Sequence, residues 1–531
     1  MTPRLAAFLA LCAELRLAQA AVIPAQDESA VPKACRKTKV AVLGAGVSGI
    51  TAAQALAAGK VDDFLIIEHN DFIGGRVHHT TFGSKPDGSP YTVELGANWI
   101  EGVGGTGPVK NPILAAAERS GIQSVFSDYD AILSYDQNGP NDYLHLLEEF
   151  AGNFTIAQQD AGYILENDLQ DSSMRAGLSV AGWKPRRDML AQAAEWWSWD
   201  FGVSYPPEDC GFQFGITGDN ETFNRFGDER YLATDQRGLN RYIRDEALTF
   251  LESETDQRLL LNTTVEAIEY SRKGVVVRNR DGGCVEAEYA ICTFSVGVLQ
   301  NDVVDFQPPL PVWKREAIEQ FQMGTYTKIF MQFNESFWPE DSQFLLYADP
   351  EERGWFPMFQ NLAAPGFLEG SNILFATVVG PQASRVEQQT DEETKEDILV
   401  VLRRMFPDKQ VPEPTAFMYP RWGLEEWAFG TYSNWPVGMT LTKHQNMRAN
   451  VDRLWFSGEA NSAQYYGFMH GAWYEGKDAG ERVAAMVSGD PIINDDTEPD
   501  GQLKRYEKLY GSVNSDEFNE GNGWLDDEEE Q

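Results

Sequence analysis

The clearest pattern of apolar runs separated by polar and glycine residues lies between residues 39 and 76. A short apolar run at residues 40–43 is typical of a buried strand. Small and aliphatic residues without proline then occupy positions 47–58 and predict a helix packed closely on a sheet. A second apolar run at residues 64–67 predicts another strand. The order strand, helix, strand is that of a nucleotide-binding unit.

Three glycines with G-x-G-x-x-G spacing join the first strand to the helix. Gly44 permits the tight turn, Gly46 lets the backbone approach a pyrophosphate, and Gly49 lets the helix lie close to the strand. The start of the helix offers free N–H groups and a partial positive charge to phosphates. Glu68 ends the second strand, where its carboxylate can accept hydrogen bonds from both ribose hydroxyls of an adenosine. The pattern predicts a dinucleotide site rather than a glycine-rich turn without a ligand.

A second glycine turn helps to choose the dinucleotide. Gly74, Gly75 and Arg76 resemble the extension found in FAD-dependent oxidases and oxidoreductases, where the arginine runs along the dinucleotide. We therefore expect FAD, and an NAD-dependent dehydrogenase is the less favoured alternative.

Farther along, the periodicity changes twice. Residues 108–226 are mostly helical in pattern, with a dense aromatic cluster at 195–201 that serves either as core or as a substrate wall. After residue 235 the chain predicts strands at 258–262, 265–270, 274–278 and 287–299, with an Asp-Gly-Gly turn at 281–283. A third apolar block at 453–459 leads into a helix predicted over residues 471–487.

Composition narrows the class of partner. The chain has 531 residues, enough for two large domains, and a formal net charge of −38. Such a charge disfavours nucleic acid and anionic membranes, and it favours cationic ligands. Fourteen acidic and three basic residues lie from Asp490 onward, so part of the net negative charge belongs to the C-terminal tail. A solvated acidic surface and steering of a cationic substrate both remain open.

The N-terminus predicts secretion. Arg4 precedes an apolar run at residues 5–13 and a small-x-small cleavage site at 18–20, which together are typical of a signal peptide. No other stretch is long and apolar enough to span a bilayer. Four N-x-S/T sequons agree with export, at Asn153, Asn220, Asn262 and Asn334.

The cysteines and histidines add few constraints. Cys12 leaves with the signal peptide, and the remaining Cys35, Cys210, Cys284 and Cys292 allow at most two disulfides. Cys292 lies in an apolar run and is expected to be a buried thiol. The six histidines show no metal-ligand spacing, so we expect no metal site.

Six stretches taken together resemble the flavin-containing amine oxidases, and most closely the extracellular polyamine oxidases of plants and fungi. They extend over nearly the whole mature chain. They read VAVLGAGVSG with IGGR (40–49 and 73–76), ELGANWIEG (94–102), DQRG (235–238), MGTYTKIFMQF (323–333), GTYSNWPVG (430–438) and LWFSGEANSAQYYGFMHGAW (454–473).

The resemblance implies an α/β fold with an α+β substrate domain. A Rossmann-like FAD-binding domain of the glutathione-reductase and amine-oxidase type is expected at residues 37–107, 227–308 and 418–488. A substrate-binding domain is expected at 108–226 and 309–417. The signal peptide at 1–20 precedes them, and an acidic, disordered tail at 489–531 follows.

The resemblance also implies catalytic roles. Glu101 matches the acid that family members place over the flavin, where a carboxylate can bind the substrate ammonium. Lys328 matches the lysine that holds a water against flavin N5 and is thought to assist the reaction with oxygen. Tyr326 shares its face of the strand. Tyr432 matches an aromatic ring over the reactive face of the flavin, and Phe468 stands opposite, where family members commonly have tyrosine.

Cofactor contacts follow from the same match. The backbone of Val265 corresponds to a position that meets the adenine, and Glu459 to an acid near the ribityl–pyrophosphate region. Thr431 stands where the monoamine-oxidase branch has a flavin-linked cysteine, so the FAD is expected to be non-covalent. The expected FAD-binding residues are Gly44, Gly46, Gly49, Glu68, Gly75, Arg76, Asn98, Trp99, Val265, Trp422, Glu459 and Phe468.

One departure bears on the substrate. The plant enzymes have a carboxylate in the stretch matching residues 197–207, whereas this chain has Gly202 at that place and only Asp200 nearby. The length and the charge of the preferred substrate therefore stay open.

The expected activity is oxidation of a secondary amine of spermine, spermidine or an N-acetyl derivative. Oxygen would be reduced to hydrogen peroxide by a secreted monomer. One alternative is an oxidase of L-amino acids or of a secondary-metabolite amine, for which Arg421 is the candidate partner of a substrate carboxylate. A second is a flavin-bearing polyamine-binding protein of low activity.

Overall fold

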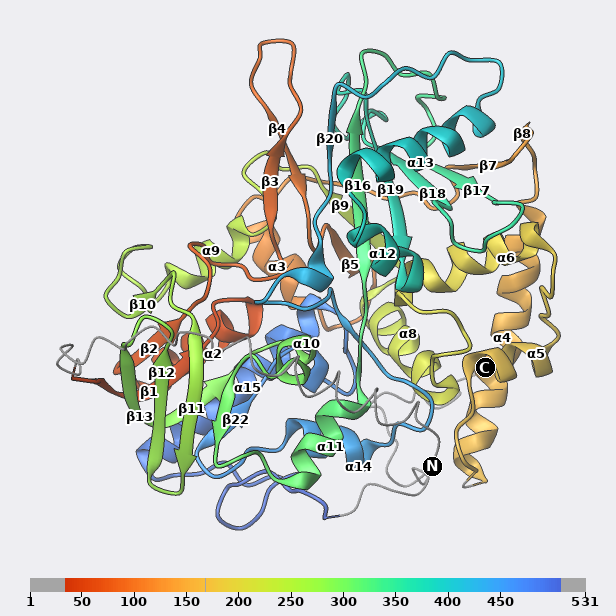
Figure 1. The fold of residues 1–531 in the computed structure, drawn as a ribbon. Helices are drawn as coiled ribbons and strands as arrows, with labels where there is room; N and C mark the ends of the chain where they lie inside the picture. Colours follow the sequence, from red (N-terminus) through yellow and green to blue (C-terminus); the bar gives the residue numbers. More distant parts are fainter. Residues whose placement is uncertain (1–33, 168, 508–531) are drawn as a thin grey trace, which may run out of the picture. The chain divides into compact units, whose positions relative to one another are not determined.

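The computed structural model describes residues 34–167 and 169–507. Its first large sheet has eight strands in the described residues, in the order β10-β2-β1-β13-β12-β11-β14, with β22 also paired to β13 (Figure 1). The strands are β1 (Arg36–Leu43), β2 (Phe64–Ile67), β10 (Leu259–Leu260), β11 (Val265–Ser271), β12 (Gly274–Asn279), β13 (Cys284–Cys292), β14 (Asp305–Gln307) and β22 (Leu454–Phe456).

The centre of this sheet is parallel. Strand β1 pairs in parallel with β2 and β13, and β22 pairs in parallel with β13. The Asp-Gly-Gly turn predicted from the sequence joins β12 to β13, which are antiparallel. The central strands are buried on both faces, as their unbroken apolar runs require.

Two helices cover the first sheet at close range. Helix α2 (Val47–Ala58) has the predicted limits, and α15 (Met469–Ser488) packs along it. Small residues permit the approach: a Cβ on Gly480 would lie 2.5 Å from the carbonyl oxygen of Ala52, and one on Gly476 would collide with that of Ser48. The expected disposition of strand, glycine turn and helix is therefore present.

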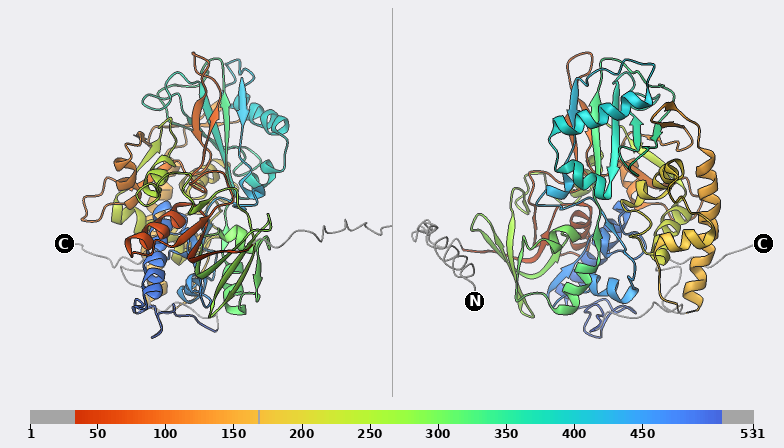
Figure 2. Two further views of the ribbon diagram at one scale, coloured as in Figure 1. Left: turned by 90° about the vertical axis from the view of Figure 1, so that its left-hand side faces the viewer. Right: turned by 45° about the vertical axis from the view of Figure 1, so that its right-hand side comes forward.

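The second large sheet has seven strands in the described residues, ordered β20-β16-β19-β18-β17-β7-β8. Its strands are β7 (Ile132–Asp136), β8 (Gly139–Pro140), β16 (Tyr326–Gln332), β17 (Phe344–Tyr347), β18 (Met358–Asn361), β19 (Ile373–Val379) and β20 (Ala416–Met418). Helices α12 (Gly380–Glu387) and α13 (Asp391–Met405) cover one face, visible in Figures 1 and 2. Ile398 and Leu402 of α13 share a core cluster with Ile329 and Met331 of β16.

A helical region lies between residues 145 and 226. Figure 2 shows its members gathered together, in the orange to yellow part of the colour scale. They are α4 (His145–Glu166), α5 (Met174–Ala181), α6 (Met189–Glu195), the π-helix η1 (Trp196–Asp200), α7 (Phe201–Val203) and α8 (Phe212–Phe226).

Short sheets and helices connect these layers. The small sheets are β3 (His79–Phe82) with β4 (Tyr91–Glu94), β5 (Trp99–Val103) with β9 (Glu229–Ala233) and β6 (Ser124–Phe126), and β15 (Gln322–Met323) with β21 (Ser433–Asn434). The remaining helices are α3 (Pro112–Arg119), α9 (Arg241–Ala247), α10 (Val296–Gln300), α11 (Val312–Gln320), η2 (Trp422–Leu424), α14 (Leu441–Arg448) and η3 (Glu459–Asn461). In the described residues, the structure contains no helix long and apolar enough to cross a membrane.

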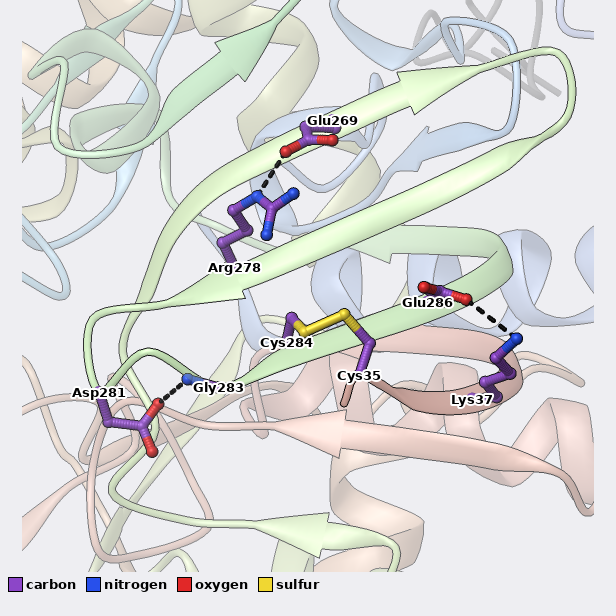
Figure 3. Close-up of a disulfide and its surroundings, with 8 residues drawn as sticks. All are labelled: Cys35, Lys37, Glu269, Arg278, Asp281, Gly283, Cys284 and Glu286. Carbon is purple, nitrogen blue, oxygen red and sulfur yellow. Dashed lines mark hydrogen bonds and ion pairs between the residues drawn. A yellow bond between two sulfur atoms is a disulfide. The ribbon is translucent and has the colours of Figure 1, made fainter. Parts of the chain in front are cut away.

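A disulfide joins Cys35 to Cys284 at the start of the paired strands β1 and β13 (Figure 3). An ion pair of 3.3 Å between Lys37 and Glu286 bridges the same two strands. Cys210 and Cys292 are buried free thiols, as predicted for Cys292. Cys12 and the predicted signal peptide lie outside the described residues.

Two sequence-based predictions are wrong. The strand expected at 287–299 ends at Cys292, because Ser295 caps a new helix, α10, by accepting a hydrogen bond from Val298 N. The tail expected to be disordered from residue 489 is ordered in its described part. Asp496 pairs with Arg448 and Arg482, and Leu503 is buried. The limits of the two predicted domains stay predictions.

Candidate active site

A cavity of about 540 Å³ runs between the two large sheets and the helical region. At one end it is lined by the glycine turns after β1 and β2, which we call the glycine end. We call the other end the amine end; its lining includes Glu101, Tyr129, Trp197, Phe201, Phe223, Arg230, Tyr326, Lys328, Tyr432 and Phe468.

Four glycines of two turns line the glycine end: Gly44, Gly46, Gly74 and Gly75. The backbones of Gly46 and Gly74 form a bridge, and a Cβ on Gly75 would lie 3.2 Å from Gly46 Cα. Gly75 has φ of 56°, a left-handed conformation that glycine adopts without strain. The two turns therefore form a backbone cradle with no side chains in it.

The helix N-terminus completes this cradle. Gly46 is the N-cap of α2 and supplies no side-chain cap, and Gly46, Val47 and Ser48 of this first turn line the cavity. The first N–H groups of a helix have no partner within the helix, so they are available to a ligand here. Gly49 does not line the cavity. A Cβ at Gly49 would collide with the carbonyl oxygen of Gly44, so this glycine acts by letting the helix approach the strand.

Glu68 closes the glycine end after β2. Its Oε2 accepts from Ala45 N at 2.7 Å and its Oε1 from Asn70 N at 2.8 Å. Burial raises the pKa of this carboxyl, and the backbone donors oppose that shift. Glu68 lines the cavity, and a carboxylate oxygen can accept more than one hydrogen bond. Val265, predicted to meet the adenine, lines the same region.

Arg76 and Glu459 form an ion pair of 2.9 Å beside the cradle. Arg76 also donates to Thr431 O, at 2.8 Å. Glu459 accepts from Ser433 N, Ser433 Oγ and Gly467 N. Glu459 thus joins the distant Arg76 to Ser433 and to the neighbouring Gly467, which the sequence match to a cofactor contact did not anticipate. Asn98, Trp99 and Trp422 line the cavity as well.

The glycine end fits a dinucleotide. It combines a backbone cradle and an uncapped helix N-terminus for phosphates with an acid positioned for a ribose. The residues present therefore fit a dinucleotide such as FAD.

A β-bulge aims Glu101 into the amine end. The register of β5 against β9 shifts between Glu101 and Val103, and Gly102 takes φ of 68°. Such bulges redirect a side chain. About 27% of the Glu101 side chain is exposed, and it lies 3.7 Å from the guanidinium of Arg230. Burial raises the pKa of the Glu101 carboxyl, and Arg230 opposes this.

Lys328 and Tyr326 reach the cavity from alternate positions of β16. The Lys328 ammonium donates to Gly96 O and lies 5.9 Å from the centre of the Trp99 ring. Burial lowers the pKa of Lys328 to about 7, and Glu94 acts in the opposite direction. At neutral pH this side chain can therefore hold or release a proton.

Aromatic rings form most of the remaining wall. Trp197 stacks on Phe201 with centroids 4.9 Å apart, and the rings of Tyr326 and Tyr432 lie 6.1 Å apart. The Tyr432 hydroxyl donates to Gly202 O at 3.0 Å. Phe468 also lines the cavity. Such a wall suits the methylene chain of an amine. The aromatic cluster at 195–201 thus lines the cavity in part.

Two candidates from the sequence lie elsewhere. Asp200 does not line the cavity: it is buried and bonded to Arg353 through both oxygens, at 2.6 and 2.7 Å. Arg421, the candidate partner of a substrate carboxylate, does not line the cavity either. It donates to the carbonyls of Glu387 and Gln389 and pairs with Asp391. Arg421 is therefore structural.

Arg230 is the main cavity residue that the sequence reasoning missed. It lies directly opposite Glu101 in the register of β5 and β9. Its guanidinium lies 4.2 Å from the centre of the Phe223 ring and 4.8 Å from that of Tyr129. The pairing joins residues far apart in the chain, and no local motif marks it.

The sequence profile described as flavin containing amine oxidoreductase matches residues 47–484. The chain belongs to this family. Among similar proteins, polyamine oxidase 1 of Zea mays is 36% identical over 83% of this chain and 89% of the maize protein. Polyamine oxidase 6 of Oryza sativa subsp. japonica is 35% identical over 84% of this chain and 90% of its own length.

A solved structure with a different sequence has a similar fold. Putrescine oxidase bound to putrescine aligns with a TM-score of 0.66 at 20% identity, covering 86% of this chain and all of the other. The family confirms the predictions of an α/β fold, an FAD cofactor and an enzyme that oxidises amines. The individual roles of the lining residues stay predictions.

Proposed function

We propose that this amine oxidoreductase oxidises a secondary amine within a polyamine chain. The products are an aldehyde, a smaller amine and hydrogen peroxide, formed from the amine, oxygen and water. The similarity to plant polyamine oxidases over more than four fifths of the chain carries the proposal. A carboxylate, Glu101, at an aromatic-walled cavity supports it.

Bound FAD would accept a hydride from the substrate α-carbon and pass the electrons to oxygen. The glycine turns, Glu68 and Arg76 would hold the cofactor at the glycine end. We propose that it is not covalently attached, since Thr431 replaces a linking cysteine and its hydroxyl donates to Gly324 O at 2.9 Å.

Two residues would handle charge and protons. Glu101 binds and orients the substrate nitrogen, which must be neutral to react, and its carboxylate favours cationic nitrogens nearby. Lys328 holds a proton beside Gly96 O and can donate it where oxygen becomes negatively charged. The rings of Trp197, Phe201 and Tyr432 exclude water and align the alkyl chain.

We also propose that the protein is secreted and glycosylated. The disulfide between Cys35 and Cys284 supports an oxidising compartment. The sequon residues Asn262 and Asn334 are exposed, so a glycan could attach there. Asn153 is less suitable, because its side chain donates to Glu149 O within α4. Mass spectrometry of the secreted protein, with and without deglycosylation, tests this proposal.

A peroxide-coupled assay tests the proposed activity. The purified protein, with its visible spectrum recorded, is offered spermine, spermidine, N-acetylated polyamines, monoamines and L-amino acids. We expect a flavin spectrum and turnover of polyamine chains, and a loss of about tenfold or more in kcat/KM in Glu101→Gln. Glu118→Gln, which changes an exposed carboxylate paired with Lys110, is the control.

Other outcomes would overturn parts of the proposal. Turnover confined to monoamines or L-amino acids would leave the family assignment standing and remove the polyamine substrate. A yellow protein inert toward every amine would favour the binding-protein alternative. Unchanged kinetics in Glu101→Gln would remove Glu101 from the reaction site.

A further inference from the structure

The amine end contains an arginine beside its carboxylate. Arg230 Nε lies 3.7 Å from Glu101 Oε1, and about a quarter of each side chain is exposed. Both side chains line the cavity. A guanidinium therefore lies beside the carboxylate that is proposed to bind the substrate nitrogen.

Arg230 is held in place by its neighbours. Its guanidinium lies over the rings of Phe223 and Tyr129, which favours a planar cation between aromatic faces. Its Nη1 donates to Asp228 O at 3.3 Å. Nη2 has no hydrogen-bond partner among the described residues, so the fork retains a donor for a ligand.

The charges at the amine end do not suit a polycation. Among the described lining side chains at this end, Glu101 is the one carboxylate, and Arg230 already pairs with it. Asp200 is engaged with Arg353 outside the cavity. A Cβ at Gly202 would meet no atom within 4 Å, so the place of a second carboxylate is open space. A free polyamine would bring several ammonium groups to one shared carboxylate.

Guanidinium groups recognise carbonyl and carboxylate oxygens. An amide oxygen can accept one N–H, and a carboxylate can accept two in parallel. Acylation of a terminal nitrogen also removes one positive charge from a polyamine. An acceptor oxygen and a lower positive charge would each reduce the repulsion between Arg230 and the substrate.

We propose that Arg230 is a specificity-determining residue that binds a carbonyl or carboxylate oxygen of the substrate. The site then prefers an amine with an acylated or carboxylate-bearing end over a free polyamine. This inference rests on the proposed amine oxidation and narrows its substrate class. The oxygen comes from an N-acyl group or from an amino acid, and the test distinguishes the two.

The test compares wild-type protein with Arg230→Met and Arg230→Lys on N-acetylspermine, spermine and L-amino acids. For wild type we expect kcat/KM at least tenfold higher for the acylated amine than for spermine. Arg230→Met should lose at least tenfold on the acylated amine, mainly through KM, and should gain on spermine. Arg230→Lys keeps the charge and loses the fork, so its loss should be intermediate.

Arg385→Met is the matched control. Arg385 also pairs with a glutamate, Glu352, and lies over an aromatic ring, Trp355, but it does not line the cavity. Flavin content and thermal unfolding establish that each variant is folded. If Arg230→Met does not fold, the inference is tested by comparing Arg230→Lys with wild type in the ratio of kcat/KM for N-acetylspermine to kcat/KM for spermine.

The outcomes separate this inference from the proposed function. Preference for the acylated polyamine, lost in Arg230→Met, supports both. Turnover of amino acids that depends on Arg230 supports the inference and overturns the polyamine substrate. Turnover of free spermine that equals or exceeds that of the acylated amine, unaffected by Arg230→Met, supports the proposed function and overturns the inference.

Discussion

Two buried groups of opposite charge interact at the cavity: Lys328, which lines it, and Glu94, which does not. Burial raises the pKa of Glu94 to about 7 and lowers that of Lys328 to about 7. Glu94 Oε1 accepts from Leu239 N at 2.6 Å, which partly offsets the cost of burying it. Each charge favours the ionised form of the other, so the two protonation equilibria are linked.

The position of Lys328 predicts a pH dependence. Its ammonium form predominates below pH 7 and is lost as pH rises through that value. If the ammonium stabilises negative charge on oxygen, the reaction of the reduced enzyme with oxygen should slow as pH rises through 7. Lys328→Met should slow that step at least tenfold and remove the dependence, while reduction by the amine changes little.

Stopped-flow measurement of the two half-reactions between pH 5.5 and 8.5 checks this prediction. Lys477→Met, at an exposed lysine on α15, is the control. A pH dependence of the oxygen reaction that persists in Lys328→Met would assign the titration to another group.

For single residues, the sequence predicted which side chains lie together better than it predicted the groups to which they bond. The motif match grouped Glu101, Lys328, Tyr326, Tyr432 and Phe468 at one site, and all five line one cavity, while their roles stay predictions. What each side chain bonds to was not predictable, because those partners come from other segments. The pairing of Asp200 with Arg353, 153 positions away, is such a case.

The contact between α2 and α15 depends on small side chains. Gly476 and Gly480 lie one turn apart on α15, and both face the backbone of α2. The first turn of helix α2 also lines the cavity, through Val47 and Ser48. The packing of α15 therefore bears on the cofactor site through α2.

Gly476→Val tests this contact. The new side chain would collide with the carbonyl of Ser48, and overpacking of this kind costs about 1–3 kcal/mol. We expect a lower free energy of unfolding and weaker retention of flavin. Chemical denaturation and the ratio of flavin to protein absorbance measure both. Lys477→Val, at the next and exposed position, should change stability much less; equal losses in the two variants would contradict the packing argument.

Element prediction succeeded where one local pattern decided the structure. Helix α2 and strand β2 have the predicted limits, because Gly46 and Gly59 flank the helix and acidic residues flank the apolar run of the strand. The strand expected at 287–299 was predicted too long, since its apolar residues continue into α10 after the cap at Ser295. An apolar run cannot by itself distinguish a buried strand from a buried helix.

On the scale of the whole molecule, a covalent link joins positions 249 residues apart. Cys35 stands before β1, and Cys284 begins β13, its parallel neighbour in the sheet. The disulfide closes a long loop in the unfolded chain and so lowers the conformational entropy of the unfolded state.

Cys35→Ser should therefore lower the free energy of unfolding by about 2–4 kcal/mol. Reduction of the wild-type protein should produce a similar loss, and added reductant should have no further effect on the variant. Urea unfolding with and without dithiothreitol measures all four states. A Cys35→Ser variant as stable as wild type would show that the disulfide adds nothing to the stability given by the pairing of β1 with β13.

The sequence by itself determined the nucleotide-binding unit, the flavin and a set of residues that line one cavity. These features rest on short-range patterns, in which glycine spacing and apolar runs dictate the backbone locally. Tertiary structure alone decided the charge of the amine end. Glu101 faces Arg230 through the register of two antiparallel strands, and Asp200 turns toward Arg353 instead of the cavity. Such pairings depend on where distant segments meet in space, which no local pattern specifies.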